Sequence, residues 1–535
     1  MERYPGIIAL VLVLIATIRV VSTYSVLSHT FDEPDHIACG MEWLDRHTYT
    51  YETQHPPLAR VAAAIGPYLL GIRSQRRERL DKEATAVIYD HHQYDRTLTA
   101  ARLGILPFFW IACLVTYQWA RRAFDARVAV GAVFFFSFLP PVLAHAGLAT
   151  TDMALTALLG AAFFSSLIFV EDPSPAHGAL FGACTALAVL SKFSALAFLP
   201  VTWIIALAFY VFAERPKFRE FAAGVRRLLP ALALAVLIAV VMIWGAYRFS
   251  YGDAGFAGLR LPAPELFRGI QVVRDHNREG HATYLLGERN TTGFWYFFPV
   301  VLGVKTPLAL LALLATAWLL PAANRLWSRR ALPVAAFAAG ILLVGMASRI
   351  NIGVRHILPI YIAFSILGAV ALSRWFALSD ARPWLAALPA VLLLWFAASS
   401  LFSHPDYIPY FNELAGSHPE NIVVDSDLDW GQDLKRLGTR LSEAHAPELT
   451  YNQFNTGDLE HEHGFPPIRE MNLAAPSPGW NAADLTYLKE RRLGLYNAYP
   501  NVRLWPDYIP PTEMVGHSIR LWYFPYPGDR RQSAP

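Results

Sequence analysis

Long apolar runs separated by short polar connections recur along the 535-residue chain up to about residue 403. A helix needs roughly 20 apolar residues to cross a membrane, so the pattern predicts about eleven transmembrane helices. We expect them at residues 6–27, 98–120, 128–146, 152–170, 178–191, 194–213, 229–249, 294–320, 332–347, 356–373 and 383–402. An odd number of spans places the two ends of the chain on opposite sides of the membrane.

The first segment that departs from this pattern is residues 28–97, which mix polar, charged and apolar positions. That mixture is typical of amphipathic helices that lie at a membrane interface. We expect this first periplasmic loop to form such helices and to cover a cavity. Together with the spans it makes up a predicted all-α polytopic membrane domain, residues 1–403.

The second interruption is the C-terminal part, residues 404–535, where long apolar runs stop. Strand-like stretches, NIVV at 421–424 and IRLWYF at 519–524, alternate there with the helix-like DWGQDLKRLGTRLSEA at 429–444. The pattern predicts a small extracytoplasmic α/β domain.

Lysine and arginine are unevenly distributed between the two predicted faces. Basic residues concentrate in the connections 121–127, 214–227, 324–330 and 373–382, on the face that carries the N-terminus. Cytoplasmic loops of membrane proteins carry this excess of positive charge. We therefore expect a multi-pass protein of the bacterial inner (plasma) membrane with a cytoplasmic N-terminus and a periplasmic or extracellular C-terminus.

Composition agrees with a membrane protein. Hydrophobic residues make up 54% of the chain and charged residues 16%, and the mean hydropathy is +0.32. The formal net charge is only +3, so the basic loops indicate contact with membrane lipids and give no case for nucleic acid. Three scattered cysteines, Cys39, Cys113 and Cys184, are too few for a disulfide framework or a zinc site.

Acidic residues follow the first predicted span directly. The stretch SHTFDEPDHIACG (28–40) places Asp32 and Glu33 at the outer edge of the membrane, and Asp152 lies between two later apolar runs. These carboxylates are either ordinary loop charges and helix caps or groups that face a cavity and act as a general base.

A second polar stretch, HPPLAR (55–60), places His55 before two prolines and Arg60 one turn into the helix that they start. It is either a plain helix-start turn or part of the same site. Cations also lie on the outer side, against the usual preference for the cytoplasmic face. Candidate substrate-binding residues are therefore His55, Arg60, Lys192, Glu288, Lys305, Arg349, Arg355 and His356.

Lys192 has a simpler alternative, since a lone lysine in an apolar hairpin can extend its ammonium to the interface. An anion bound on the outer side would explain the whole set of cations. A carboxylate that deprotonates a hydroxyl, together with cations that hold a phosphate leaving group, suits sugar transfer from a lipid phosphate.

The sequence resembles a known family, the bacterial relatives of the protein O-mannosyltransferases. The stretches that carry the resemblance are FDEPDH, HPPLAR, AHAGLATTDMAL, LSKFSAL, GVKTP, RINIGVRHILPIY and YFNELAG followed by DSDLDWGQDLKRL. This family has the GT-C membrane fold and uses polyprenyl-phosphate-linked sugars. The aminoarabinose transferases of lipid A share the fold and are similar to this chain more distantly.

The resemblance implies roles for several residues. Asp32 would be the catalytic base, Glu33 would support the fold or the acceptor, Asp152 would be a second acidic point, and His55 would lie near the donor phosphate. The reaction would invert the anomeric carbon and transfer the sugar to an acceptor protein, lipid or glycan.

The resemblance also bears on cofactors. The aminoarabinose transferases have an acidic residue and a lysine before the prolines, where this chain has Gln54 and His55. We therefore predict no cofactor and no metal, with a divalent metal as the open alternative.

The tail stretch DSDLDWGQD (425–433) places carboxylates two residues apart, as in a calcium-binding loop. It lacks the loop's glycine and glutamate, because Trp430 and Arg436 occupy those positions. We expect instead a domain that closes over the active site, in which Trp430 either stacks on a sugar or belongs to the core.

Two other classes of protein remain possible from the sequence. A transporter of a lipid-linked or small anionic substrate would also carry charges within the membrane. A non-catalytic glycan-binding protein would tolerate loss of Asp32.

Overall fold

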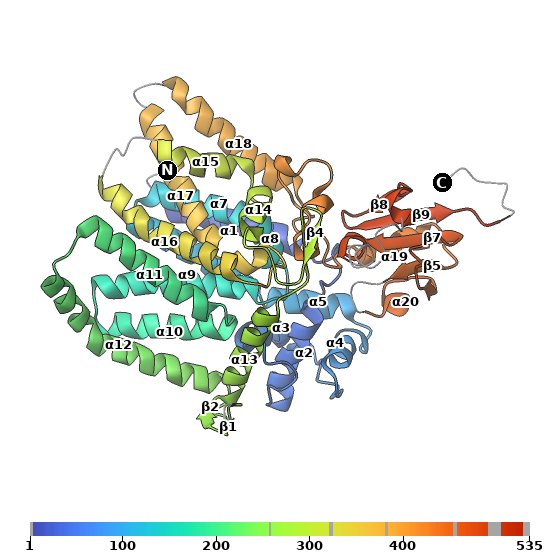
Figure 1. Cartoon of the computed structure of the whole chain (residues 1–535), viewed down its shortest axis with the longest axis horizontal. Helices are drawn as coiled ribbons and strands as arrows, with labels where there is room; N and C mark the ends of the chain where they lie inside the picture. The colour runs from blue at the N-terminus through green and yellow to red at the C-terminus, as the bar shows by residue number, and fades with distance from the viewer. Residues whose placement is uncertain are drawn as a thin grey trace.

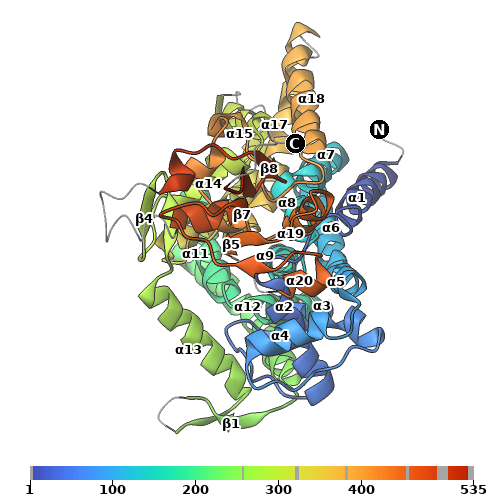
Figure 2. The same ribbon diagram turned by 90° about the vertical axis from the view of Figure 1, so that its right-hand side faces the viewer.

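The computed structural model describes residues 4–255, 258–319, 325–379, 383–452, 457–490 and 504–527. Helices form one large body, and a small sheet of C-terminal strands packs at one end of it (Figure 1). Turned by 90°, this sheet lies in front of the ends of the helices (Figure 2). The sheet therefore covers one end of the helical body.

Among the described residues, seven helical segments are long and apolar enough to cross a membrane. They are Tyr94–Ala123, which contains α5 (Tyr94–Leu103) and α6 (Leu106–Ala123), α9 (Asp152–Glu171), α11 (Ala195–Glu214), α12 (Phe218–Ala246), most of α16 (Arg325–Ala347), most of α17 (Ile360–Ser379), and Pro383–Phe402, which ends in α18 (Ala387–Phe402). The prediction of a polytopic helical membrane protein is confirmed.

Two further segments qualify as bent pairs. In the first, α7 (Ala126–Phe138) and α8 (Pro140–Ala146) meet at 66°, and in the second, α14 (Phe297–Lys305) and α15 (Leu308–Leu319) meet at 110°. Each bend falls at an extended residue before a proline, because proline disfavours helical backbone in the preceding residue.

The remaining two predicted spans correspond to shorter apolar helices, α1 (Pro5–Val21) and α10 (Pro175–Ser191). Each has 17 residues, which is at the lower limit for crossing a membrane. All eleven predicted runs are thus helical, but between seven and nine described segments satisfy the length and composition of a span.

Close helix packing depends on small residues in α10. A side chain at Gly178 or Gly182 would overlap the backbone of α12 at Ala231 or Ala235. Small residues allow helices to approach closely where no water drives them together.

The segment that follows α1 is helical, as predicted for residues 28–97. It contains α2 (Glu33–Met41), a π-helical turn (Glu42–Arg46), α3 (Pro57–Leu69) and α4 (Leu80–Tyr89). Helix α3 is amphipathic, with alanines in the core and Leu69 79% exposed.

The segment between α12 and α14 adds strands that the sequence analysis missed. Strands β1 (Tyr251–Asp253) and β2 (Arg260–Pro262) form one hairpin, and β3 (Thr283–Leu285) and β4 (Glu288–Asn290) form another. Helix α13 (Pro264–Glu279) joins the two hairpins.

The C-terminal sheet has five strands in the order β6-β5-β7-β9-β8. Strands β6 (Ile468–Arg469), β5 (Leu449–Asn452) and β7 (Gly479–Asp484) are parallel, whereas β9 (Ile519–Phe524) runs antiparallel to β7 and to β8 (Glu513–Val515). Helices α19 (Leu434–Glu443) and α20 (Leu459–Glu462) complete this region. The predicted α/β character of the tail is confirmed.

The predicted strand at 519–524 is β9, but the predicted strand at 421–424 is wrong. Residues 422–424 belong to no strand. Val424 packs with Tyr284 and Leu485, and the next amide, that of Asp425, bonds to the Thr486 hydroxyl. Tertiary contacts therefore stabilise this apolar run as a loop and not as a strand.

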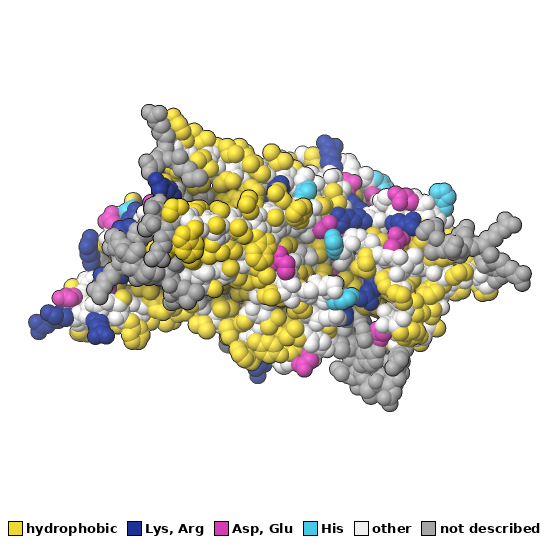
Figure 3. All heavy atoms as spheres, turned by 90° about the horizontal axis from the view of Figure 1, so that it is seen from above, with side chains coloured by type: hydrophobic (Ala, Val, Ile, Leu, Met, Phe, Trp, Pro, Cys, Tyr) yellow, Lys and Arg dark blue, Asp and Glu magenta, His cyan; other side chains and the backbone are white. Residues whose placement is uncertain are grey.

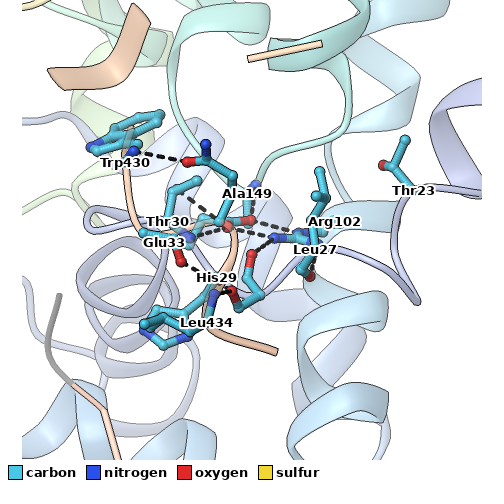
Figure 4. Close-up of polar contacts among 12 residues, drawn as sticks. Thr23, Leu27, His29, Thr30, Glu33, Arg102, Ala149, Trp430 and Leu434 are labelled. Atoms are coloured by element: carbon cyan, nitrogen blue, oxygen red, sulfur yellow. Dashed lines mark hydrogen bonds and ion pairs between the residues drawn. The ribbon is translucent and has the colours of Figure 1, made fainter. Parts of the chain in front are cut away.

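The segment that follows α1 is bonded to the C-terminal tail beside the sheet. The amides of Ser28 and Phe31 donate to the carbonyls of Gln432 and Trp430, both at 3.0 Å, and the Leu434 amide donates to the Ser28 hydroxyl at 3.0 Å. Figure 4 shows this crossing next to Glu33. The segment that leads into α2 is thus bonded to the tail.

A buried ion pair fixes the start of α2. The Glu33 side chain is 0% exposed and receives the Arg102 guanidinium on both oxygens, at 2.9 and 2.8 Å. The amides of Thr30 and Ala149 donate to the same carboxylate, each at 2.8 Å (Figure 4). Burial raises the pKa of Glu33, but the Arg102 charge and these donors outweigh it and hold the pKa below its ordinary value.

Arg102→Met should leave Glu33 buried without a counter-ion and destabilise the protein by about 3–5 kcal/mol. Arg79, whose pair with Asp81 is exposed, supplies the control, because Arg79→Met should cost about 0–1 kcal/mol. Thermal unfolding in detergent checks both variants. Equal losses of stability would contradict the role of the buried pair.

Candidate active site

Four charged side chains from distant parts of the chain form one connected series. Arg355 Nη1 lies 2.7 Å from Asp32 Oδ2 and 3.7 Å from Asp152 Oδ2. Lys192 Nζ lies 2.6 Å from Asp152 Oδ1. We call Asp32, Arg355, Asp152 and Lys192 the ion-pair chain. Sequence analysis predicted all four as site residues, and the structure brings them together.

The members of the ion-pair chain differ in their access to solvent. The Asp152 side chain is 0% exposed, that of Arg355 6% and that of Lys192 10%, whereas 26% of the Asp32 side chain is exposed. Asp32 therefore forms the accessible end of a series that is otherwise buried.

Local backbone structure directs these side chains. Asp32 precedes the first residue of α2 but makes no capping hydrogen bond, so its carboxylate is available to Arg355. Asp152 is the first residue of α9, where the helix dipole favours a negative charge. Lys192 follows α10 in extended backbone.

Arg355 lies in the 3-10 turn Val354–Ile357 and is held from two further sides. Its Nε donates to Ser426 Oγ at 3.1 Å, and its guanidinium carbon lies 4.1 Å from the centre of the Trp430 ring. Burial opposes the charge, yet Asp32 and Asp152 raise the pKa of Arg355 above its ordinary value. Arg355 remains a cation.

Two predicted histidines, His55 and His356, lie beside the ion-pair chain, and both are half-buried. Both interact electrostatically with Lys192. Burial, together with Lys192 and Arg355, lowers the pKa of His356 well below its ordinary value. Burial also lowers the pKa of His55. At neutral pH both side chains are uncharged and offer hydrogen bonds, so His356 is not the cation that the sequence pattern indicated.

Arg60 contacts His55 and a second histidine, His36. Its side chain is buried, and its guanidinium is held by Glu52. Arg60 Nε lies 3.0 Å from His36 Nδ1, and Nη2 lies 3.1 Å from His55 Nδ1. This geometry makes Arg60 a residue that positions His55.

Glu33 directs neither oxygen to the ion-pair chain, because Arg102 and two amides occupy its carboxylate. Lys305 donates to the carbonyls of Ile408 and Asp427 at 2.7 and 2.6 Å. It thereby links α14 to the C-terminal tail.

The last two predicted residues lie on the surface. Arg349 is exposed and donates to the carbonyl of Arg278 at 3.1 Å, and Glu288 is exposed on β4. Within the described part of the chain, no hydrogen bond or ion pair connects Lys305, Arg349 or Glu288 to the ion-pair chain.

The sequence analysis missed three residues near the site. Ser426 holds Arg355, and the half-buried Asp425 lies close enough to interact with both Arg355 and Asp32. His281, between α13 and β3, interacts with the same two charges. The alternating DSD stretch was a signal for the first two, whereas nothing in the sequence around His281 marks it.

Trp430 belongs to the core. It is 1% exposed, and one face of its ring is covered by the Arg355 guanidinium. Of the two alternatives for this residue, the structure therefore favours packing over sugar stacking.

Among the described residues, no group of three or more His, Cys, Asp and Glu side chains is arranged to hold a metal ion. Asp32 and Asp152 are instead paired with cations. Metal independence stays a prediction.

Comparison with known proteins identifies the class. Residues 94–244 match the protein family described as dolichyl-phosphate-mannose-protein mannosyltransferase. No curated protein matches the chain.

Solved structures give the fold. The structure of ArnT from Cupriavidus metallidurans bound to undecaprenyl phosphate matches with a TM-score of 0.52 and 15% identity, over 96% of this chain and 97% of that one. AglB from Archaeoglobus fulgidus, in complex with an inhibitory peptide and a dolichol-phosphate, gives a TM-score of 0.46 and 14% identity over 92% and 72%.

The protein is a membrane glycosyltransferase with the GT-C fold. The predicted resemblance to the protein O-mannosyltransferases is confirmed by the family match over residues 94–244 and by the fold over nearly the whole chain.

Asp425 should make stability depend on pH. Withdrawal from water and the nearby Glu490 carboxylate raise its pKa to about 8, against the opposing effect of Arg355. The folded protein keeps this proton up to about pH 8, whereas an unfolded aspartate loses it near pH ~4. The stability from the protonated form is complete below the lower value and is lost as pH rises through the upper one.

Asp425→Asn cannot ionise, so wild type should lose thermal stability relative to this variant between about pH 5 and about pH 9. Melting temperatures in detergent at both values test this. The exposed Asp90 gives the matched control, Asp90→Asn, which should track wild type. A pH-independent difference between wild type and Asp425→Asn would refute the assignment.

Proposed function

We propose that the protein is an inverting glycosyltransferase that moves a sugar from a polyprenyl-phosphate-linked donor to an acceptor hydroxyl on the outer side of the membrane. The observation that carries this proposal is the ion-pair chain, in which one accessible carboxylate, Asp32, adjoins two buried cations. The solved relative ArnT, which shares the fold, is bound to undecaprenyl phosphate.

The reaction needs a base, and Asp32 supplies it. An oxygen of the Asp32 carboxylate accepts the proton of the acceptor hydroxyl as that hydroxyl attacks the anomeric carbon. The bond from this carbon to the phosphate oxygen breaks, and its electron pair leaves with the polyprenyl phosphate. Attack opposite the leaving group inverts the anomeric carbon.

Lys192 and Arg355 act on the leaving group. Negative charge grows on the phosphate as the bond breaks, so fixed cations bind the transition state more tightly than the donor. The uncharged His55 and His356 donate hydrogen bonds to the phosphate oxygens, and Arg60 orients His55.

Asp152 and Glu33 serve the site without touching the reacting atoms. Asp152 is fully buried and neutralises Lys192 and Arg355 before the donor arrives. Glu33 anchors the start of α2 through Arg102 and so fixes the position of the adjacent Asp32.

The placement in the membrane follows the charge pattern. A broad hydrophobic surface covers the helical body, with charged side chains gathered at its two ends (Figure 3). The basic connection between α11 and α12 lies at the end away from the C-terminal sheet (Figure 1). This arrangement supports a protein of the bacterial inner membrane with a cytoplasmic N-terminus and a periplasmic C-terminal region.

Asp32→Asn should lower the release of free polyprenyl phosphate from a polyprenyl-phosphate sugar by roughly a hundredfold or more, because the general base is lost. Asp275→Asn, an identical change at an exposed position of α13, should leave release unchanged. The assay uses purified protein in detergent, without a gradient, with a panel of donors and acceptors. Normal turnover by Asp32→Asn would refute the mechanism. Wild-type protein that binds donors without turning any of them over would favour a transporter or glycan-binding protein.

A chelator should leave this activity intact, since the side chains of Lys192 and Arg355 neutralise the leaving phosphate. Loss of activity in EDTA, restored by a divalent cation, would contradict metal independence.

A further inference from the structure

The contact between Arg355 and Asp32 raises a difficulty for the proposed reaction. Arg355 Nη1 lies 2.7 Å from Asp32 Oδ2, so the cation meant for the phosphate is bonded to the carboxylate meant for the proton. The side of the Asp32 carboxylate that faces Arg355 is occupied by this hydrogen bond and is closed to an acceptor hydroxyl. The reaction needs the Asp32 carboxylate free to accept a proton and the Arg355 guanidinium free to bind the phosphate.

We infer that Asp32 and the donor phosphate compete for Arg355, so that binding of the donor frees the base. This inference rests on the proposed function. In the structure Arg355 pairs with Asp32, and the arriving phosphate takes the place of the Asp32 carboxylate.

Burial determines which carboxylate gives way. Asp152 is 0% exposed and is also bonded to Lys192 at 2.6 Å, so leaving it unpaired would strand a buried charge. Asp32 is 26% exposed, and water can solvate its carboxylate once Arg355 turns away. The pair with Asp32 is therefore the exchangeable one.

The rest of the guanidinium is held during the exchange. Ser426 accepts from Nε at 3.1 Å, and Trp430 covers one face at 4.1 Å. Only the Nη end needs to change partner, through a small rotation about contacts that persist. Ser426 and Trp430 thus position Arg355 and are not themselves catalytic.

Proton transfer during the reaction also favours the exchange of Arg355 from Asp32 to the phosphate. When Asp32 accepts the proton of the acceptor it loses its charge and its attraction for Arg355. The leaving phosphate gains charge at the same moment. Arg355 is therefore bound most tightly to the phosphate when the anomeric bond breaks.

The competition makes a prediction about binding alone, with polyprenyl phosphate as the probe and no acceptor present. Asp32→Asn should bind polyprenyl phosphate at least about fivefold more tightly than wild type, because the competing carboxylate is removed. Arg355→Gln should bind it more weakly. In the double variant the gain from Asp32→Asn should disappear.

Titration of the full chain in detergent measures these affinities. Asp35→Asn, one turn further along α2, is the matched control for general repulsion between a carboxylate and the phosphate, and its affinity should equal that of wild type. Should Arg355→Gln fail to fold, Arg355→Lys replaces it, and the gain should then be smaller than in the wild-type background.

The outcomes separate the two proposals. Three results would overturn the competition and leave the proposed function standing. Asp32→Asn would bind polyprenyl phosphate no more tightly than wild type, Asp35→Asn would show the same increase in affinity, or the increase would persist without Arg355. Wild-type protein that binds no polyprenyl phosphate would overturn the proposed function and the inference together.

Discussion

A buried charge must be neutralised where it lies, and this constraint organises the region around the start of α2. Glu33 and Arg102 meet in the core with every contacting donor in hydrogen-bond range, because an unpaired charge there would cost several kcal/mol. Their contact fixes the start of α2, and with it the position of Asp32. The same requirement pairs Asp152 with Lys192 and Arg355.

Neighbouring residues with the same chemistry therefore have different tasks. Asp32 and Glu33 are adjacent in sequence, yet one carboxylate is partly exposed and the other is enclosed. Residue type does not distinguish them. The direction of each side chain from the start of α2 does, since one points towards Arg355 and the other towards Arg102.

Much of the fold follows from the sequence because apolar length and spacing determine membrane helices. All eleven apolar runs are helical, and the bends before Pro140 and Pro307 follow from local sterics. What the sequence did not show depends on distant contacts. Residues 422–424 are apolar like a strand but pack in a loop, and the hairpins β1–β2 and β3–β4 carry no strong local pattern.

The candidate site shows the same division. Asp32, Asp152, Lys192 and Arg355 stood out because charges beside apolar runs are unusual, and they meet in space. Lys305 stood out for the same reason, yet it bonds to backbone carbonyls. Only the fold decides whether such a charge meets a partner side chain or the backbone, and His281 had no local signal at all.

The bonding between Ser28–Phe31 and Trp430–Leu434 joins residues that are about 400 positions apart. During biosynthesis the membrane helices emerge long before the tail. Arg355 meets Ser426 and Trp430 only after the tail has been synthesised and has folded onto the helices. The candidate site is thus completed only when the tail is present, and a chain whose synthesis stops early carries its charged residues into the membrane without the contacts that order them.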